Sequence, residues 1–487
     1  MAGLQCRKYQ WYRENARKEI PEPDFSTRFM FKQGMLVGEY AKKLFPGGID
    51  LGKLRNIGEQ LIKTSEVLSE RRPIFEASAG TDKVFSRVDI LKPASGNSWD
   101  IIEVKSATQL KEEYLHDIAF QKYTFLQAGI KISNCYLAFI NNQYIKHGKI
   151  DPEELFCIRD ITPEVDEVMM SIPETVEEML EILQKPDPPD IKIGRQCDHP
   201  HTCPLKEKCW GLMPENHVFN LYGNKDKAMD LYNRGILSIE EIPEGYDLNL
   251  KQQIQKDCAI TKKPRVDRGQ ISAFLDRLEE PIYFFDFETY STALPIYEGT
   301  KPFQRIPFQY SIHVLDDLYG ESVHYDFLAP GNGDPREELL KNLKSHLGDR
   351  GTIVVYYEFF EKGVLSELAG DFPEYEEWVK SVLPRIVDLY RPFGDFYYYN
   401  SIQRGSASVK NVLPAITDYS YKGMDIADGL SASVYFLYAC GHYRIGESCP
   451  TTEEVKKIRK DLITYCRMDT GGMIHILRGL KEVLNHS

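Results

Sequence analysis

The chain has no long, uninterrupted apolar stretch. No window of its 487 residues comes near the eighteen consecutive apolar residues that a membrane-spanning helix requires. The opening residues, MAGLQCRK, also lack the apolar run of a secretory signal. These two absences predict a cytoplasmic protein with no membrane partner.

Positive charge is scarce as well. The chain has 60 Lys and Arg against 73 Asp and Glu, which gives a formal net charge of −13. This balance argues against a protein that coats nucleic acid through bulk positive charge. It leaves room for an enzyme that holds metal ions in carboxylate-rich pockets and has a locally basic groove. With 24 Phe, 29 Tyr and 42% hydrophobic residues, the chain is able to build more than one core, which excludes a wholly disordered protein.

Ten cysteines are too few, in a chain of this length that we expect to be cytoplasmic, for a disulfide framework. Three of them recur at six-residue intervals in the segment GRQCDHPHTCPLKEKCW, as Cys197, Cys203 and Cys209. A loop as polar as this one gains little core packing from three thiols. The spacing therefore predicts ligation of a metal or cluster.

The residues that are present predict an α/β protein in three parts. Residues 1–213 mix helical and strand patterns, residues 214–280 carry two or three helices, and from residue 281 onward strands alternate with helices. Within the first part, the patterns predict a helix over 34–44, a three-strand meander over 72–106, a helix over 111–128 and a strand over 135–140.

The meander carries the first candidate site. Asp89 is expected near the end of one strand, and Glu103 and Lys105 stand two apart on the next, hence on one face of the sheet. Their neighbours are apolar, and unpaired charges are costly in such surroundings. Two carboxylates can share a divalent cation, and a lysine beside it can orient or deprotonate an attacking water. Exposed charges at a strand edge would explain the pattern alone equally well.

A D…E-x-K pattern on consecutive strands, followed by a helix with Gln121, resembles the PD-(D/E)XK nucleases. The opening AGLQCRKYQWY resembles RecB-like exonucleases that carry an iron–sulfur cluster. The resemblance implies a restriction-endonuclease-like domain in which Asp89 and Glu103 bind Mg²⁺ or Mn²⁺, while Lys105 and Gln121 serve catalysis. It also implies a 4Fe–4S clasp held by four thiolates, which would suit zinc too: Cys6, Cys197, Cys203 and Cys209.

Three positions depart from the RecB-like pattern. The family's helix motif G-x-x-x-H becomes Gly34 to Gly38, so one metal ligand is missing, although Glu39 stands next to it. The family's Q-x-x-x-Y becomes Gln121 to Phe125, and the first cysteine spacing is wider than C-x2-C. A module that binds nucleic acid without cleaving it is therefore an open alternative.

The second candidate site begins on the apolar segment IYFFDFETYS. Asp286 and Glu288 are two apart there and share a face, and two like charges on a buried strand call for a cation. Late in the chain, Tyr465 and Asp469 are four apart in DLITYCRMDTGGMIHIL and share one face of a predicted helix. That pair alone fits an ordinary amphipathic helix, whereas two-metal chemistry uses carboxylates from several elements.

D-x-E on a first strand and Y-x-x-x-D on a late helix resemble the first and third motifs of DnaQ-like DEDDy exonucleases. The middle motif, N-x-x-F-D, appears as YEFFE, with Tyr357 in the place of Asn and Glu361 in the place of Asp. The resemblance implies a ribonuclease-H-like 3′–5′ exonuclease domain over 281–487, in which Tyr465 orients the nucleophilic water. It also implies that four carboxylates bind two divalent metals: Asp286, Glu288, Glu361 and Asp469.

The whole chain resembles an uncharacterised prokaryotic family that fuses the iron–sulfur RecB-like module to the DnaQ-like module. This implies a metal-dependent nuclease, with DNA single strands or ends favoured over RNA as substrate. An RNA 3′–5′ exonuclease and a redox or regulatory cluster protein without nuclease activity are the alternatives. Residues 214–280 would form a plain helical linker or, less favoured, a helix-hairpin-helix that grips the sugar-phosphate backbone.

Overall fold

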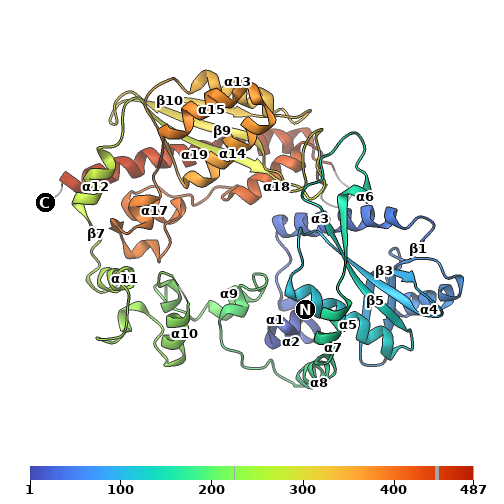
Figure 1. Ribbon diagram of the computed structural model, residues 1–487. Coiled ribbons are helices and arrows are strands. Elements are labelled where there is room, and N and C mark those ends of the chain that lie inside the picture. The colour runs from blue at the N-terminus through green and yellow to red at the C-terminus, as the bar shows by residue number, and fades with distance from the viewer. Residues whose placement is uncertain (224, 445–448, 486–487) are drawn as a thin grey trace. The chain divides into compact units, whose positions relative to one another are not determined.

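The computed structural model describes residues 1–223, 225–444 and 449–485. Packing separates the chain into two compact units, Met1–Gly211 with Ser291–Gln304, and Leu212–Tyr290 with Arg305–Ser487. Each unit contains a sheet of mixed strand direction flanked by helices, so the predicted α/β class is confirmed (Figure 1). The helical segment 214–280 belongs to the second unit.

The sheet of the first unit has six strands in the order β1-β2-β3-β4-β5-β6. Strands β2, β3 and β4 form the predicted antiparallel meander, and β5 runs parallel to β4 after a crossover through helix α5 (Glu112–Gln127). The predicted meander, helix and following strand are thus confirmed. The strands are β1 (Ile49–Asp50), β2 (Ile74–Gly80), β3 (Phe85–Pro93), β4 (Trp99–Lys105), β5 (Ile132–Ile140) and β6 (Phe156–Asp160).

Helices cover both faces of this sheet (Figure 1). Helix α3 (Phe25–Ala41) packs on one face, where Val37 and Ala41 join a core with Ile102 of β4. It begins earlier than the predicted helix over 34–44 because the Asp24 side chain accepts a hydrogen bond from the Thr27 amide and caps it. The opposite face is covered by α4 (Ile57–Val67), α5, α7 (Thr162–Met169) and α8 (Ile172–Leu183).

The remaining short helices of the first unit lie near the chain's beginning, before β6 and at the cysteine loop. They are α1 (Ala2–Gln5), α2 (Arg7–Asn15), α6 (Pro152–Leu155) and α9 (Lys206–Trp210).

The sheet of the second unit has five strands in the order β10-β9-β8-β11-β12. The first three in sequence are antiparallel neighbours, and β11 pairs in parallel with β8 and β12. The predicted alternation of strands and helices therefore starts only after β10. The strands are β8 (Ile282–Tyr290), β9 (Ile306–Leu315), β10 (Val323–Leu328), β11 (Thr352–Val355) and β12 (Ile386–Asp388).

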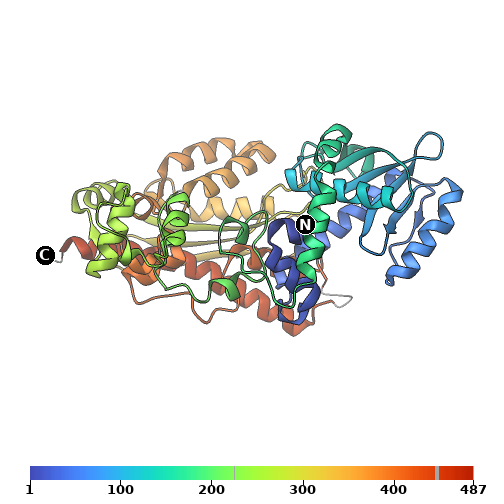
Figure 2. The same ribbon diagram turned by 90° about the horizontal axis from the view of Figure 1, so that it is seen from below.

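Two groups of helices enclose this sheet (Figure 2). On one side α13 (Arg336–His346), α14 (Glu358–Asp371) and α15 (Glu376–Val382) form a core with Phe285 and Phe287 of β8. On the other side lie α18 (Gly429–Ala439) and the long α19 (Thr452–Asn485), which includes the predicted late helix. Because side chains of a strand alternate between faces, Asp286 and Glu288 point away from the phenylalanine core.

The segment before β8 contains the predicted helices as α10 (Asp226–Asn233), α11 (Leu250–Thr261) and α12 (Arg268–Leu275). After α10 the chain turns at Gly235, whose φ of +81° suits glycine. The remaining elements of this unit are α16 (Arg391–Gly394), α17 (Val409–Ile416) and the strand pair β7 (Arg265–Val266) with β13 (Tyr398–Tyr399). No helix in the described part of the chain has the length and apolar character to cross a membrane.

Candidate functional sites

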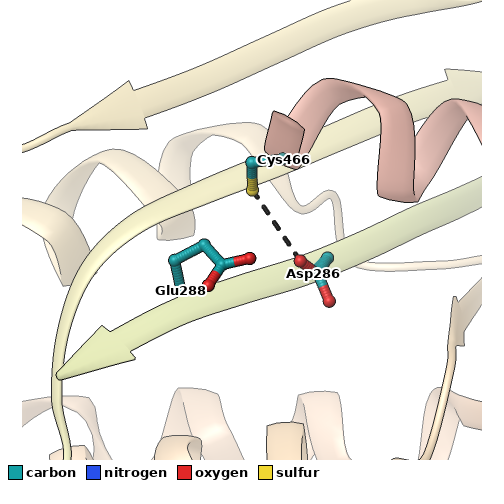
Figure 3. Close-up of side chains that lie close together, drawn as sticks. All are labelled: Asp286, Glu288 and Cys466. Atoms are coloured by element: carbon teal, nitrogen blue, oxygen red, sulfur yellow. Dashed lines mark hydrogen bonds between the residues drawn. The ribbon is translucent and has the colours of Figure 1, made fainter. Parts of the chain in front are cut away.

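Carboxylates from β8 meet α19 in the second unit. Ligand atoms of Asp286, Glu288 and Cys466 all lie within 4.8 Å of one another (Figure 3). The Cys466 thiol donates to Oδ2 of Asp286 at an S···O distance of 3.8 Å. Burial, followed by the nearby carboxylates, raises the pKa of Cys466 well above its usual range, so the thiol stays protonated. Cys466 thus donates a hydrogen bond to Asp286, and its sulfur is one of the three possible ligand atoms gathered here.

Asp469 and two tyrosines complete this group. Asp469 and Tyr465 are buried on α19, as the helical spacing predicts, and Oη of Tyr421 donates to Oδ1 of Asp469 at 2.6 Å. Burial raises the pKa of Asp469 to about 6, although hydrogen bonds from both tyrosines act in the opposite direction. Burial also raises the pKa of Tyr465 far above its usual value, so its hydroxyl keeps its proton.

The carboxylates of this site repel one another. Burial, and then the charges of Asp469 and Glu288, raise the pKa of Asp286 well above its usual range. Burial and the charge of Asp469 do the same to the pKa of Glu288. Like charges held together in a buried site are relieved by a cation, and such perturbed groups cluster at functional sites.

Glu361 on α14 belongs to the same electrostatic group. Its side chain is 1% exposed, and its Oε2 has no hydrogen-bond partner among the described residues. Burial, followed by the charge of Asp388, raises the pKa of Glu361 to about 8. The charge of Glu361 in turn raises the pKa of both Asp286 and Glu288. A buried carboxylate oxygen without a partner is costly, and a metal ion would satisfy it.

Tyr357 stands where the DnaQ-like pattern has asparagine, and it precedes α14 with a left-handed φ of +80°. Asp388 holds this conformation by accepting the Tyr357 backbone N–H at 2.8 Å. Tyr357 is 54% exposed and Phe359 is 71% exposed. The centres of their two rings lie 6.0 Å apart. A bulky residue with positive φ is uncommon, and such strain concentrates at functional sites.

A cavity of about 550 Å³ is rich in positive charge and is connected to Asp469 through Tyr421, while none of the four predicted carboxylates lines it. Tyr421, which bonds Asp469, lines it, and so does Lys410, whose Nζ is 6.0 Å from the centre of the Tyr465 ring. The ammonium of Lys410 acts to lower the pKa of both Glu288 and Asp469. The lining contains three cations and one carboxylate, in a chain whose net charge is −13: Arg404, Lys410, Lys422 and Asp418.

The first unit brings its predicted residues together as well. Nζ of Lys105 donates to Oε1 of Glu103 at 2.7 Å, and Nε2 of Gln121 donates to Oε2 of Glu103 at 2.9 Å. Oδ2 of Asp89 accepts the Val104 amide at 2.7 Å. Asp89 lies in the middle of β3 and not near a strand end as predicted, because β3 continues to Pro93.

One acidic group of this site was not predicted. Lys105 also donates to Oδ2 of Asp117 at 2.8 Å, from the helix that follows β4. Asp117 stands four residues before Gln121, so the two share a helix face, and that spacing was a usable signal.

Burial shifts the ionisation of this group strongly. Burial raises the pKa of Asp89 to about 6. Burial and the charge of Asp89 raise the pKa of Glu103 to about 8. Burial opposes the charged form of Lys105, but the carboxylates of Glu103 and Asp117 outweigh it and raise the pKa of Lys105 above its usual value. In this surrounding the charged, hydrogen-bond-donating form of Lys105 is favoured.

Helix α3 has space where the RecB-like pattern has histidine. A Cβ atom built on Gly38 would meet nothing within 4 Å, so packing does not require glycine there. The neighbouring Glu39 is exposed, and its carboxylate accepts a hydrogen bond from Lys42 at 2.6 Å. Phe125, in the place of the family tyrosine, is fully buried in the core of the unit.

The four predicted cluster ligands line a single cavity: Cys6, Cys197, Cys203 and Cys209. Gln5 fixes the first of them to the loop, since its Nε2 donates to the carbonyl oxygens of Gln196 at 2.9 Å and His201 at 2.5 Å. Burial, with smaller effects from the other three thiols, raises the pKa of Cys203 to about 11.

The spacing of these four sulfur atoms bears on what they would hold. No three of them lie within 4.8 Å of one another, in a search confined to the described residues. Four thiolates around zinc at 2.3 Å would hold their sulfur atoms about 3.8 Å apart. The four thiols thus lie around one cavity, and their chemistry suits either a 4Fe–4S cluster or zinc.

Comparison with known proteins identifies relatives without an assigned activity. A family profile described as "Domain of unknown function (DUF2779)" matches residues 283–408, which include Asp286, Glu288 and Glu361. The "Uncharacterized protein MG366 homolog" of Mycoplasma pneumoniae is 26% identical over 230 residues, 43% of this chain. The "Uncharacterized protein MG366" of Mycoplasma genitalium is 25% identical over 229 residues, also 43% of this chain. The matched part spans 33% of the length of each relative.

Proposed function

We propose that the protein is a metal-dependent nuclease that hydrolyses phosphodiester bonds of DNA, at single strands or ends, with 3′–5′ exonuclease activity in the second unit. The observation that carries this proposal is the buried carboxylate group beside a cationic cavity. In this proposal the second unit is a DnaQ-like, ribonuclease-H-like module. The first unit is a RecB-like PD-(D/E)XK module closed by a 4Fe–4S clasp.

The donor set of the second unit fits hard divalent cations. Four carboxylates supply oxygen ligands, and the unpartnered Oε2 of Glu361 is an oxygen that such an ion would satisfy. Bound Mg²⁺ or Mn²⁺ polarises a phosphoryl oxygen and activates water. The residues that would hold these ions are Asp286, Glu288, Glu361 and Asp469.

The chain's own groups have separate tasks around that centre. Tyr465, which keeps its proton and is hydrogen-bonded to Asp469, orients the attacking water through its hydroxyl oxygen. Lys410 binds a phosphate of the strand in the cavity. Cys466 and Tyr421 hold Asp286 and Asp469 in place through their hydrogen bonds. These tasks require positioning and charge, which this buried site supports.

The cavity favours an unpaired strand end as substrate. Its volume of about 550 Å³ is in the range of small-molecule sites, which accommodates one or two nucleotides and no duplex. Tyr419 in its lining is half-exposed and stacks on His475 with ring centres 3.9 Å apart. A fixed aromatic ring of this kind offers a platform on which an unpaired base stacks.

The test is digestion of end-labelled single- and double-stranded DNA and RNA, with each site altered separately. We expect stepwise 3′–5′ shortening of single-stranded DNA that Asp286→Ala reduces by about 10²–10³-fold or more. Asp461→Ala is the matched control, since this α19 carboxylate pairs with Lys457 outside the site. Unchanged digestion in Asp286→Ala would refute the proposed exonuclease site. Faster digestion of RNA than of DNA would correct the substrate.

A further inference from the structure

A third carboxylate lies in line with the acidic pair of the first unit. The ladder between β2 and β3 keeps one register along its length but skips the position where Glu76 stands opposite Asp89. The ladder between β3 and β4 ends at Ile90 with Ile102, so the next step brings Asp89 opposite Glu103. Three carboxylates therefore occupy equivalent positions on three neighbouring strands.

The backbone is distorted at this row. Glu76 adopts a φ of +58°, a left-handed conformation that side-chain-bearing residues rarely take. Across from it, the side chain of Asp89 accepts the Val104 amide, so this carboxylate takes the place of a ladder acceptor. Backbone strain of this kind persists where the surrounding fold enforces it, commonly at functional sites.

The row of Glu76, Asp89 and Glu103 has an excess of negative charge that one divalent cation would neutralise. The three carboxylates are neighbours along the row, since the register sets Glu76 opposite Asp89 and Asp89 opposite Glu103. With all carboxylates ionised, as metal binding requires, four of them carry −4 and two ion-paired cations carry +2, and −4 + 2 leaves −2: Glu76, Asp89, Glu103, Asp117, Arg87 and Lys105. The nearby Lys42 is paired with two other carboxylates, Glu39 and Asp50.

A buried amide gives an independent sign of a ligand at this place. Gln121 is 5% exposed, and its Nε2 donates to Glu103. Its Oε1 is buried and has no hydrogen-bond partner within the described part of the chain. Amide and carboxylate oxygens are the ligands that Mg²⁺ and Mn²⁺ prefer.

We propose that Glu76 supplies the metal ligand that α3 lacks at Gly38, and that Glu76, Asp89 and Glu103 together hold one divalent cation. This inference rests on the proposed nuclease chemistry of the first unit. Lys42 directly follows the last residue of α3, and a Cβ atom built on Gly52 would lie 3.2 Å from Cγ of Glu76 and 3.8 Å from Nζ of Lys42. The Glu76 side chain on β2 therefore lies near the C-terminal end of α3, the helix that carries Gly38.

Replacing Arg87 distinguishes a metal-binding role of Glu76 from a purely structural role. Its Nε lies 2.9 Å from Oε2 of Glu76, and its side chain is 45% exposed. If Glu76 is a metal ligand, Arg87 competes with the ion for it, and Arg87→Met tightens metal binding. If Glu76 only anchors Arg87, then Arg87→Met leaves metal binding unchanged or weakens it.

The test measures Mn²⁺ binding to the full chain by electron paramagnetic resonance of the free ion. Asp286→Asn and Asp469→Asn are present throughout to silence the second unit. We expect Glu76→Gln to weaken Mn²⁺ binding about tenfold or more, on the scale of lost metal-site partners. Glu66→Gln, which removes an exposed ion pair with Lys63, is the matched control and should bind like the parent.

A second variant separates a lost ligand from a damaged fold. Gly38→His, added to Glu76→Gln, should restore Mn²⁺ affinity, because the open space at Gly38 accepts a new ligand. Glu76→Gln that binds Mn²⁺ like the parent, while Glu103→Gln does not, would overturn the proposal. So would a parent chain without a Mn²⁺ site. Neither result bears on the proposed exonuclease activity of the second unit. That activity is measured separately, as DNA digestion by the chain with Asp286 and Asp469 intact.

Discussion

Asp469→Asn should stabilise the metal-free protein while it removes nuclease activity. The Asp469 carboxylate is 8% exposed and lies among the buried charges of Asp286 and Glu288. Asparagine has nearly the same shape, and its Oδ1 is able to accept the hydrogen bond that Tyr421 donates. The substitution therefore removes one repulsive charge and leaves the packing in place.

The magnitude follows from the pKa of Asp469, which burial raises from 3.8 to about 6. A carboxyl group whose pKa is higher in the folded state stabilises the fold below its unfolded pKa, and this stability is lost as the pH rises through the folded value. At about 1.4 kcal/mol for each pH unit, the parent loses about 3 kcal/mol between pH 4 and pH 7. Asp469→Asn escapes this loss, which corresponds to about 6–12 °C in melting temperature.

The assay is thermal unfolding in EDTA from pH 4 to pH 8, followed by the same series with Mn²⁺. In EDTA the melting temperature of Asp469→Asn should exceed that of the parent above pH 6 and approach it near pH 4. Saturating Mn²⁺ should remove the difference, because a ligand at a hundred times its Kd stabilises the parent by about 2.7 kcal/mol. Asp461→Asn is the control on the same helix. A lower melting temperature for Asp469→Asn in EDTA at pH 8 would refute the reasoning.

Four further predictions concern other groups. We expect the anaerobically purified protein to be brown, with absorbance at about 400 nm from an iron–sulfur cluster. Cys203→Ser should remove both this absorbance and the solubility of the protein, because ligation tethers distant segments. Stoichiometric zinc without iron in the parent would reject the cluster but not the tethering role of the four cysteines. Lys410→Met should raise KM for single-stranded DNA about tenfold with little change in kcat, and lower the salt dependence of binding by one phosphate contact. Glu361→Asp should raise the ratio of Mg²⁺- to Mn²⁺-supported digestion, because Mg²⁺ demands the more regular geometry that a shorter side chain allows. In chains already lacking Asp286, Lys105→Ala should lower residual cleavage and leave DNA affinity intact in filter binding; equal cleavage would indicate a binding platform.

Local periodicity accounts for the parts of both sites that the sequence predicted. A period of two placed Glu103 with Lys105 on one face, and the structure confirms this through their hydrogen bond. The same rule placed Asp286 beside Glu288, and their ligand atoms are within 4.8 Å of each other. The helical period placed Tyr465 and Asp469 together on α19. Each of these pairs lies within one element, so no knowledge of tertiary packing was needed.

The residues that the sequence did not reveal come from contacts between elements. Cys466 lies inside the predicted helix, yet only the packing of α19 on β8 brings its thiol to Asp286. Tyr421 and Lys410 belong to the segments between α16 and α18, where no period relates a side chain to the carboxylates. Burial in a site of this kind depends on how helices dock on the sheet, and that is decided by the whole core.

Glu76 is partly predictable from the sequence: its cross-strand partner is, and its backbone conformation is not. The β2–β3 hairpin closes with Gly80 opposite Phe85, and counting back four residues on one strand and forward four on the other brings Glu76 opposite Asp89. A hairpin turn fixes strand register, so this alignment follows from the sequence once the turn is placed correctly. The left-handed backbone of Glu76 does not follow from it, because strand register says nothing about the φ of a single residue. A cross-strand row of carboxylates is thus recognisable before a structure is known, whereas the backbone distortion at Glu76 is seen only in the structure.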